Sequence, residues 1–198
     1  MKLNDTICRE TAAGTVQHSA AAVNAANGII VISEEITSDL AMQLFSLLKY
    51  YESESRNVTI YLDSVGGEVN AGLAIYDMLQ AYPYTVDIYC VGIAASMAAI
   101  LLAGGKKGHR FILPHSKVMI HEPLFSEGFG GSATTVEKKA RNILAVKDLL
   151  NGILASHTGK SIEEINEATA YDHFLTAEEA VDFGICDAVR QAVEGVSV

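Results

Sequence analysis

Short runs of β-branched and aromatic residues alternate along this chain with longer segments in which apolar residues recur every three or four positions. The compact runs 29–32, 58–62 and 84–91 are typical of buried strands. Between them, the segments 37–48 and 69–79 place their apolar side chains on one face of a helix. Such alternation predicts an α/β domain.

A segment without charged residues extends from Ile88 to Gly105 and is long enough to be considered as a membrane span. It is rich in alanine and glycine, and Lys106 follows its end directly. A buried strand that turns at Gly92 into a small-residue helix over about 95–102 accounts for the same pattern. We therefore expect a buried helix there and no contact with a membrane.

The longest helical pattern in the chain runs from about residue 132 to residue 157 and stops at Gly159. Capping-box sequences at 161–164 and 176–179 predict the first turns of two more helices. Further short strands are expected at 111–113, 117–120 and 185–189. No repeat or linker interrupts the sequence, which predicts a single domain over 29–198.

Residues 1–28 differ from the rest of the chain. They are mostly polar, and their alanine-rich patch is too weakly apolar for the core of a signal peptide. We interpret them as a mobile or loosely packed N-terminal segment. The whole chain is 49% hydrophobic and 19% charged, which is the composition of a packed globule rather than of a disordered chain.

Charge and cysteine content exclude several functions. The formal net charge is −10 with only 14 lysine and arginine residues, which disfavours binding to nucleic acid or to anionic lipid. Cys8, Cys90 and Cys186 are far apart and form no C-x-x-C pair, so neither a zinc site nor a disulfide framework is expected. We expect a cytoplasmic protein without metal or cofactor.

Ser96 is the first candidate for chemistry, because it lies where a predicted strand meets a predicted helix of small residues. Free backbone N–H groups and the helix dipole at such a junction favour a developing oxyanion. The alternative is a serine that only caps or packs within a tight turn.

His121 and Asp172 could complete a catalytic set with this serine. His121 ends the apolar run 118–120, and a neutral-range imidazole can act as general base and then as general acid. Asp172 precedes a capped helix, and its carboxylate could orient the imidazole. A packing histidine and a solvated loop aspartate are the plain alternatives, and spacing alone leaves both open.

The pair Gly66-Gly67 follows a predicted strand and could present N–H groups to an anion. A glycine pair is usually just a turn. The dinucleotide pattern G-x-G-x-x-G and the G-x-S-x-G turn of the α/β-hydrolases are both absent from the sequence.

Several separated motifs resemble those of the Clp protease proteolytic subunit, in the same order. The segment 92–97, Gly-Ile-Ala-Ala-Ser-Met, is similar to the nucleophile motif of that family, and 118–123 is similar to its histidine motif. The segment 171–176 resembles its aspartate motif, and 64–67 its glycine turn followed by the helix 71–77. The resemblance extends from about residue 28 to residue 190.

The resemblance implies a crotonase-like α/β fold and peptide-bond cleavage through an acyl-enzyme. It assigns Ser96 as nucleophile, His121 as general base and acid, and Asp172 as the residue that orients His121. It places the oxyanion donors on the backbone N–H groups of Gly67 and Met97. A coenzyme-A-binding enzyme on the related crotonase fold is another hypothesis, but it leaves the serine and histidine motifs unexplained.

The same resemblance implies an assembly. The helix 132–157 would be the handle that interlocks two rings of seven subunits into a tetradecamer, and 128–131 would lie at the contact between rings, where a substrate strand can also align. An AAA+ unfoldase would feed unfolded polypeptides into the enclosed chamber and hydrolyse the ATP. The alternative is a catalytically weak, structural subunit that works in mixed rings with a paralogue.

This chain also departs from the pattern of the family it resembles. Asp63, Val65 and Ile93 stand where the family usually has Asn, Pro and Gln. Ala170 and Tyr171 replace an acid–arginine pair that helps to lock the two rings. On the face that would meet the unfoldase, Tyr61 is retained but Thr59 replaces a tyrosine, and the N-terminal segment lacks the usual axial-loop sequence. We expect weaker stacking of the rings and altered docking of the unfoldase.

Overall fold

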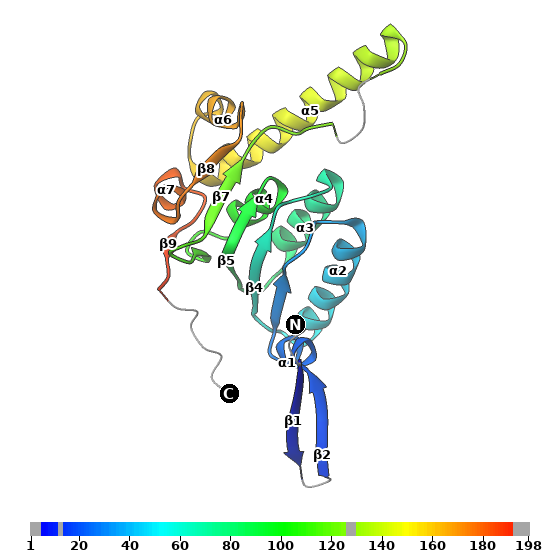
Figure 1. Cartoon of the computed structure of the whole chain (residues 1–198), viewed down its shortest axis with the longest axis vertical. Helices are drawn as coiled ribbons and strands as arrows, with labels where there is room; N and C mark the ends of the chain where they lie inside the picture. The colour runs from blue at the N-terminus through cyan, green and yellow to red at the C-terminus, as the bar shows by residue number, and fades with distance from the viewer. Residues whose placement is uncertain (1–4, 12–13, 126–129, 192–198) are drawn as a thin grey trace.

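The computed structural model describes residues 5–11, 14–125 and 130–191, and a mixed sheet lies at its centre (Figure 1). Five strands follow one another in parallel across this sheet: β3 (Ile29–Ile32), β4 (Val58–Ser64), β5 (Val86–Ala95), β6 (Arg110–Ile112) and β9 (Ala188–Val189). Two further strands extend it beyond the end of β6, with β7 (Lys117–Ile120) parallel to β5 and β8 (His173–Leu175) antiparallel to β7. The α/β architecture predicted from the sequence pattern is confirmed.

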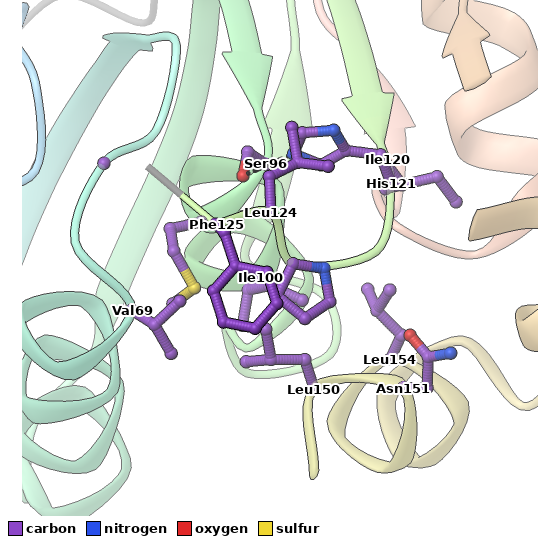
Figure 2. Close-up of a pocket in the computed structure, with 13 residues that line it drawn as sticks. Val69, Ser96, Ile100, Ile120, His121, Leu124, Phe125, Leu150, Asn151 and Leu154 are labelled. Atoms are coloured by element: carbon purple, nitrogen blue, oxygen red, sulfur yellow. Dashed lines mark hydrogen bonds between the residues drawn. The ribbon is translucent and has the colours of Figure 1, made fainter. Parts of the chain in front are cut away.

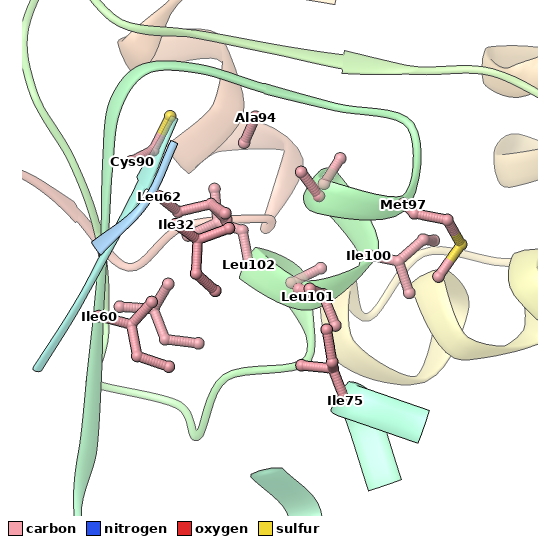
Figure 3. Close-up of a cluster of buried hydrophobic side chains, with 14 of the residues drawn as sticks. Ile32, Ile60, Leu62, Ile75, Cys90, Ala94, Met97, Ile100, Leu101 and Leu102 are labelled. Atoms are coloured by element: carbon pink, nitrogen blue, oxygen red, sulfur yellow. The ribbon is translucent and has the colours of Figure 1, made fainter. Parts of the chain in front are cut away.

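The apolar faces of three helices supply most of the helical residues in the core. They are α2 (Ser38–Ser53), α3 (Val69–Ala81) and α4 (Met97–Ala103). Figure 3 shows Ile60 and Leu62 of β4 facing Leu101 and Leu102 of α4, with Ile75 of α3 beside them. Burying a side chain of this size contributes roughly 1.5–3 kcal/mol, so this cluster fixes α4 against the sheet.

Every residue of α4 is buried, which explains the segment without charge that the sequence shows there. A helix covered on all sides has no place for a charged side chain. Within the described part of the chain, no helix combines the length and the apolar character that a membrane crossing requires.

Strand β5 differs from its prediction, because it does not end at Gly92. It continues to Ala95, pairing first with β6 and then with β7. Gly92 has a φ of +97°, and its N–H donates to Ser116 Oγ over 2.8 Å. The next N–H, of Ile93, donates to Asp63 Oδ1 over 3.0 Å. These two bonds to side chains take the place of backbone bonds between β4 and β5, where the register of that pair shifts. Gly92 therefore bends the strand and does not end it.

The long helix α5 (Ala133–Thr158) projects away from the sheet (Figure 1). Its buried residues, Leu150, Asn151 and Leu154, all lie in its C-terminal half. Ser132 caps its first turn and Gly159 ends it with a φ of +78°. The helix predicted over 132–157 is therefore present, within one residue at each end.

Two short helices close the second half of the domain. Capping boxes are formed at α6 (Ile162–Thr169), by Ser161 and Glu164, and at α7 (Ala177–Phe183), by Thr176 and Glu179. Both boxes were predicted from the sequence and are confirmed. The strand expected over 185–189 is shorter, because only its last two residues pair with β6.

A buried arginine joins the ends of three helices. Arg110 forms two bonds to the Asp187 carboxylate, Nη2 to Oδ1 over 2.6 Å and Nε to Oδ2 over 3.0 Å. Its Nη1 donates to the carbonyl oxygens of Ala103, His157 and Gly184 over 3.0–3.2 Å. These carbonyls lie at the C-terminal ends of α4, α5 and α7, where helices lack partners of their own.

The N-terminal segment contains elements that the sequence analysis did not assign. Strands β1 (Thr6–Thr11) and β2 (Gly14–Ser19) form an antiparallel hairpin, followed by α1 (Ala20–Ala26). All side chains of β2 are exposed, and α1 buries none. The last turn of α1 is attached to the body by two donors, Tyr51 Oη to the carbonyl of Ala25 and Arg56 Nη1 to that of Ala26. The mobility expected for residues 1–28 stays a prediction.

Candidate active site

Ser96 occupies a strained turn between β5 and α4. Its φ of 54° and ψ of −121° lie in a region that non-glycine residues rarely adopt. The turn is held in place because Ser96 N–H donates to the carbonyl of Met119 in β7 over 2.8 Å. Figure 2 shows Ser96 beside His121 at one rim of a cavity whose opposite side is formed by Leu150 of α5.

Strand pairing brings the three candidate residues together. In the ladder between β5 and β7, Ala95 faces Met119, so Ser96 and His121 emerge at the same end of neighbouring strands. In the antiparallel ladder between β7 and β8, Ile120 faces His173, which places Asp172 opposite His121.

The resulting contacts form a chain of hydrogen bonds. His121 Nε2 lies 2.9 Å from Ser96 Oγ, and His121 Nδ1 lies 3.1 Å from Asp172 Oδ1. With the imidazole proton on Nδ1, His121 donates to the carboxylate and Nε2 is free to accept the serine proton. The His121 side chain is 14% exposed, whereas that of Asp172 is 63% exposed. Solvent therefore screens the attraction between the carboxylate and the ring.

The glycine turn packs directly against the nucleophile turn. Gly66 has a φ of +97°, and a Cβ at this position would lie 2.7 Å from the carbonyl oxygen of Ala95 and 2.8 Å from Ser96 Cβ. Only glycine fits at this distance, because real Cβ atoms do not approach other atoms so closely. From the sequence this pair was interpreted as a turn that could present N–H groups to an anion, and the close approach of Gly66 to the Ser96 turn was missed.

The backbone N–H groups of Gly67 and Met97, expected from the resemblance to be oxyanion donors, lie beside the same cavity. The bridge between Ile36 and the glycine turn uses the N–H groups of Ile36 and Glu68, and leaves that of Gly67 out. Met97 is the first residue of α4, a position whose N–H has no acceptor within a helix. Gly67 and Met97 line the same cavity as Ser96 and His121.

The cavity next to Ser96 measures about 320 Å³ and is largely apolar. Among the described lining residues Asn151 carries the one side-chain amide, and it is already bonded, since Nδ2 donates to Asn166 Oδ1 over 2.7 Å and to Thr169 Oγ1 over 3.1 Å. The remaining walls beside the catalytic rim are side chains of Val69, Met97, Ile100, Ile120, Pro123, Leu124, Phe125, Leu150 and Leu154. Such a pocket suits an apolar side chain of a ligand.

The comparison with protein families agrees with this geometry. The family model described as Clp protease matches residues 14–193, which includes β2 of the hairpin and all of the sheet. This chain belongs to the Clp protease family. It is therefore a peptidase of the serine hydrolase type by family, and the Ser96–His121–Asp172 set is the candidate active site of a Clp-type peptidase.

Four of the positions that depart from the expected Clp pattern are placed as follows. Asp63 accepts the N–H of Ile93 at the bend of β5. Val65, in the glycine turn, is 66% exposed, and Tyr171, next to the candidate catalytic aspartate, is 86% exposed. Ala170 is the residue at which α6 ends.

Other predicted features of a Clp subunit are placed as follows. Rings of Tyr61, Tyr89 and Phe111 are in contact, with centroids 5.6 Å and 4.8 Å apart along this row. The segment 128–131, expected at a contact between rings, lies partly outside the described residues. The described residues contain no group of three His, Cys, Asp or Glu side chains that could hold a metal ion.

Proposed function

We propose that this Clp-family chain is a serine endopeptidase that cleaves unfolded polypeptides into short peptides. The observation that carries the proposal is the continuous chain of contacts from Ser96 Oγ through His121 to Asp172, at the rim of an apolar cavity. The strained turn at Ser96 supports the proposal, because backbone strain of this kind persists mainly where it holds a functional side chain in a required position.

The geometry supports reaction through an acyl-enzyme. His121 Nε2 takes the proton of Ser96 Oγ as the oxygen attacks the substrate carbonyl carbon. The N–H groups of Gly67 and Met97 stabilise the resulting oxyanion. The peptide C–N bond then breaks, and His121 gives its proton to the leaving amine. Water then attacks the acyl carbon while His121 takes one of its protons, and the bond to Ser96 Oγ breaks as His121 returns that proton to the serine oxygen. The product leaves as a carboxylic acid, and Asp172 holds the imidazole ring throughout.

Labelling by a fluorophosphonate probe tests the proposal, together with hydrolysis of a fluorogenic peptide. Wild type should label and turn over the peptide, and Ser96→Ala should lose labelling and lower kcat/KM by at least about 10³-fold. Ser46→Ala is a matched control, because Ser46 is an exposed residue of α2 whose hydroxyl bonds only to the carbonyl of Met42 in its own helix. Labelling that persists in Ser96→Ala would contradict the proposal.

The finer assignments belong to the same proposal. The fold is crotonase-like, α5 is the handle helix, and rings of seven subunits stack into a tetradecamer that an AAA+ unfoldase feeds in the cytoplasm. Support comes from α5, which exposes Leu144 by 57% and Leu149 by 51%, an apolar surface suited to a second copy of the chain. Native mass spectrometry of wild type and Leu144→Asp tests the assembly. A monomeric wild type, or an unaffected Leu144→Asp, would contradict it.

A second candidate function is a structural subunit that is active only in mixed rings with a paralogue. The exposure of Tyr171 and of Asp172 favours it, because that surface is not covered within one chain. A folded, ring-forming sample that does not react with the fluorophosphonate would favour this second function over the first.

A further inference from the structure

Gly72 is a buried glycine in the first turns of α3, at a place where the backbone does not require glycine. Its N–H donates to the carbonyl of Glu68 over 3.0 Å, as in a regular helix, and its φ is not among the positive values of the chain. A glycine inside a helix is less stable than an alanine at the same position. The reason for Gly72 must therefore lie in the space around it.

The side chain of Met97 occupies that space. A Cβ added to Gly72 would overlap Met97 Cε and would lie 3.3 Å from both Cβ and Cγ of Met97. Met97 is 2% exposed, and Figure 3 shows its side chain leaving the first turn of α4 alongside Ile100. The missing Cβ at Gly72 thus makes a recess in α3 that holds the end of the Met97 thioether.

The same methionine forms part of the wall of the cavity beside Ser96. Methionine has three rotatable side-chain bonds and adapts to the shape around it. On the side that faces α3, Met97 is packed against Gly72, and every residue of its own helix α4 is buried. On the side of the cavity it meets about 320 Å³ of open space. A thioether displaced from its recess would move toward the cavity.

We propose that Gly72 sets the width of the apolar cavity and so determines how large a substrate side chain can precede the scissile bond. Gly72 acts through Met97 and does not touch the substrate, which makes it a positioning residue. This inference rests on the proposed peptidase function. It adds a determinant of specificity outside the cavity, because Gly72 of α3 controls the position of a side chain in the wall formed by α4 and α5.

The test compares Gly72→Ala with wild type on two fluorogenic peptides that differ only in having Leu or Ala before the scissile bond. The ratio of kcat/KM for the Leu peptide over the Ala peptide should fall by about 10-fold or more, since a pocket reduced by one methyl group discriminates on that scale. Gly152→Ala is the matched control. Gly152 is also inside a helix, α5, but its added Cβ would meet no atom within 4 Å, and the ratio should not change.

A general weakening of the enzyme would lower both peptides alike, whereas the inference requires a change in their ratio. It also requires the effect to depend on Met97. In a Met97→Ala background, Gly72→Ala should leave the ratio as Met97→Ala alone has it. A ratio that is unchanged in Gly72→Ala, or that falls equally with and without the methionine, overturns the inference.

Thermal unfolding separates this inference from the proposed function. With Met97 present, Gly72→Ala should lower Tm by about 2–8 °C through overpacking. In the Met97→Ala background it should raise Tm, because alanine is the better helix former. If wild type does not react with a fluorophosphonate, the proposed function fails, yet the sign of these shifts still decides the contact. A Gly72→Ala variant more stable than wild type overturns the inference whatever the activity.

Discussion

Replacing Arg110 by methionine should destabilise the whole domain, because the buried guanidinium donates to one carboxylate and to three backbone carbonyl oxygens. Arg110 is 3% exposed and its partner Asp187 has a side chain that is 14% exposed, so the pair is shielded from solvent. The same side chain donates to carbonyl oxygens at the ends of α4, α5 and α7. Methionine fills much of the volume but supplies none of these donors.

The expected loss can be worked from these contacts. Removing one partner of a buried ion pair costs about 3–5 kcal/mol, since the other charge stays buried and unpaired. Asp187 keeps two backbone donors, the N–H groups of Gly108 over 2.7 Å and of Arg110 itself over 3.0 Å, which reduces the cost. The carbonyls left without a donor increase it by roughly 1 kcal/mol each. We expect a net loss of about 3–5 kcal/mol in the free energy of unfolding.

Chemical denaturation near neutral pH measures this loss. Arg141→Met is the matched control, because Arg141 lies on an exposed part of α5 and, among the described residues, pairs only with Glu137 one turn away, with side chains 77% and 59% exposed. That variant should stay within about 0.5 kcal/mol of wild type. The double variant Arg110→Met with Asp187→Leu should be more stable than Arg110→Met alone, because it leaves no unpaired charge. An Arg110→Met variant within about 1 kcal/mol of wild type would refute the reasoning.

The same pair makes stability depend on pH. Burial raises the pKa of Asp187, but the hydrogen bonds and the charge of Arg110 outweigh burial and hold that pKa below its usual value. A carboxyl whose pKa is lowered by folding stabilises the folded state above its unfolded pKa of about 4, and this contribution disappears as pH falls through the folded pKa. Asp187→Asn should therefore be less stable than wild type near neutral pH, and the difference should narrow in acid. A difference that stays constant in acid would speak against the pair.

Three further changes test other parts of the molecule. Gly66→Ala should lower kcat/KM by about 10²-fold or more, because its Cβ would push apart the glycine turn and the Ser96 turn, which carry the proposed oxyanion donors. Peptide hydrolysis at the wild-type rate would exclude this contact from the active state. Asp172→Asn should lower kcat by about 10–10³-fold through the wrong imidazole tautomer, and steady-state kinetics with an unchanged kcat would remove Asp172 from the triad. Burial and then the charge of Arg110 lower the pKa of His157, whose Nε2 lies 2.8 Å from Tyr76 Oη. Neutral His157 therefore stabilises the fold fully above its unfolded pKa of about 6.5, and this contribution is lost as pH falls through the lower folded pKa. His157→Gln should show a smaller drop in Tm than wild type between about pH 7.5 and about pH 5, and equal drops would assign the pH dependence to other groups.

The candidate site could be located from the sequence because its residues lie at the ends of elements that pattern alone predicts. Ser96 and His121 each follow a recognisable apolar run, and Asp172 precedes a capping box. Pattern alone did not select them, since a turn serine and a loop aspartate look the same. The resemblance of several motifs in one order made the choice, and the registers of β5, β7 and β8 explain why these ends meet.

Elements without an apolar pattern were missed for a physical reason. The hairpin of β1 and β2 is built mostly from polar residues, and all side chains of β2 are exposed, so no buried face marks it in the sequence. Strand β8 has three residues, too few to show a period of two. In the sequence Arg110 directly precedes a short apolar run, and nothing distinguishes it from an exposed arginine. It is a buried donor because the C-terminal ends of three helices lie around it in the fold.

Space is the property that sequence patterns carry least, and glycines in this chain show why. Each of three glycines has a different reason, set by a residue about 25–30 positions away: Ala95 meets Gly66, Met97 meets Gly72, and the Asp63 carboxylate lies where a side chain on Gly92 would be. From sequence, the first and third look like turns and the second like a weak point in a helix. In the structure all three adjust the backbone or the wall beside Ser96. Substitutions at such glycines change how closely the elements of the site approach one another. Activity and specificity should therefore respond to them before the fold does.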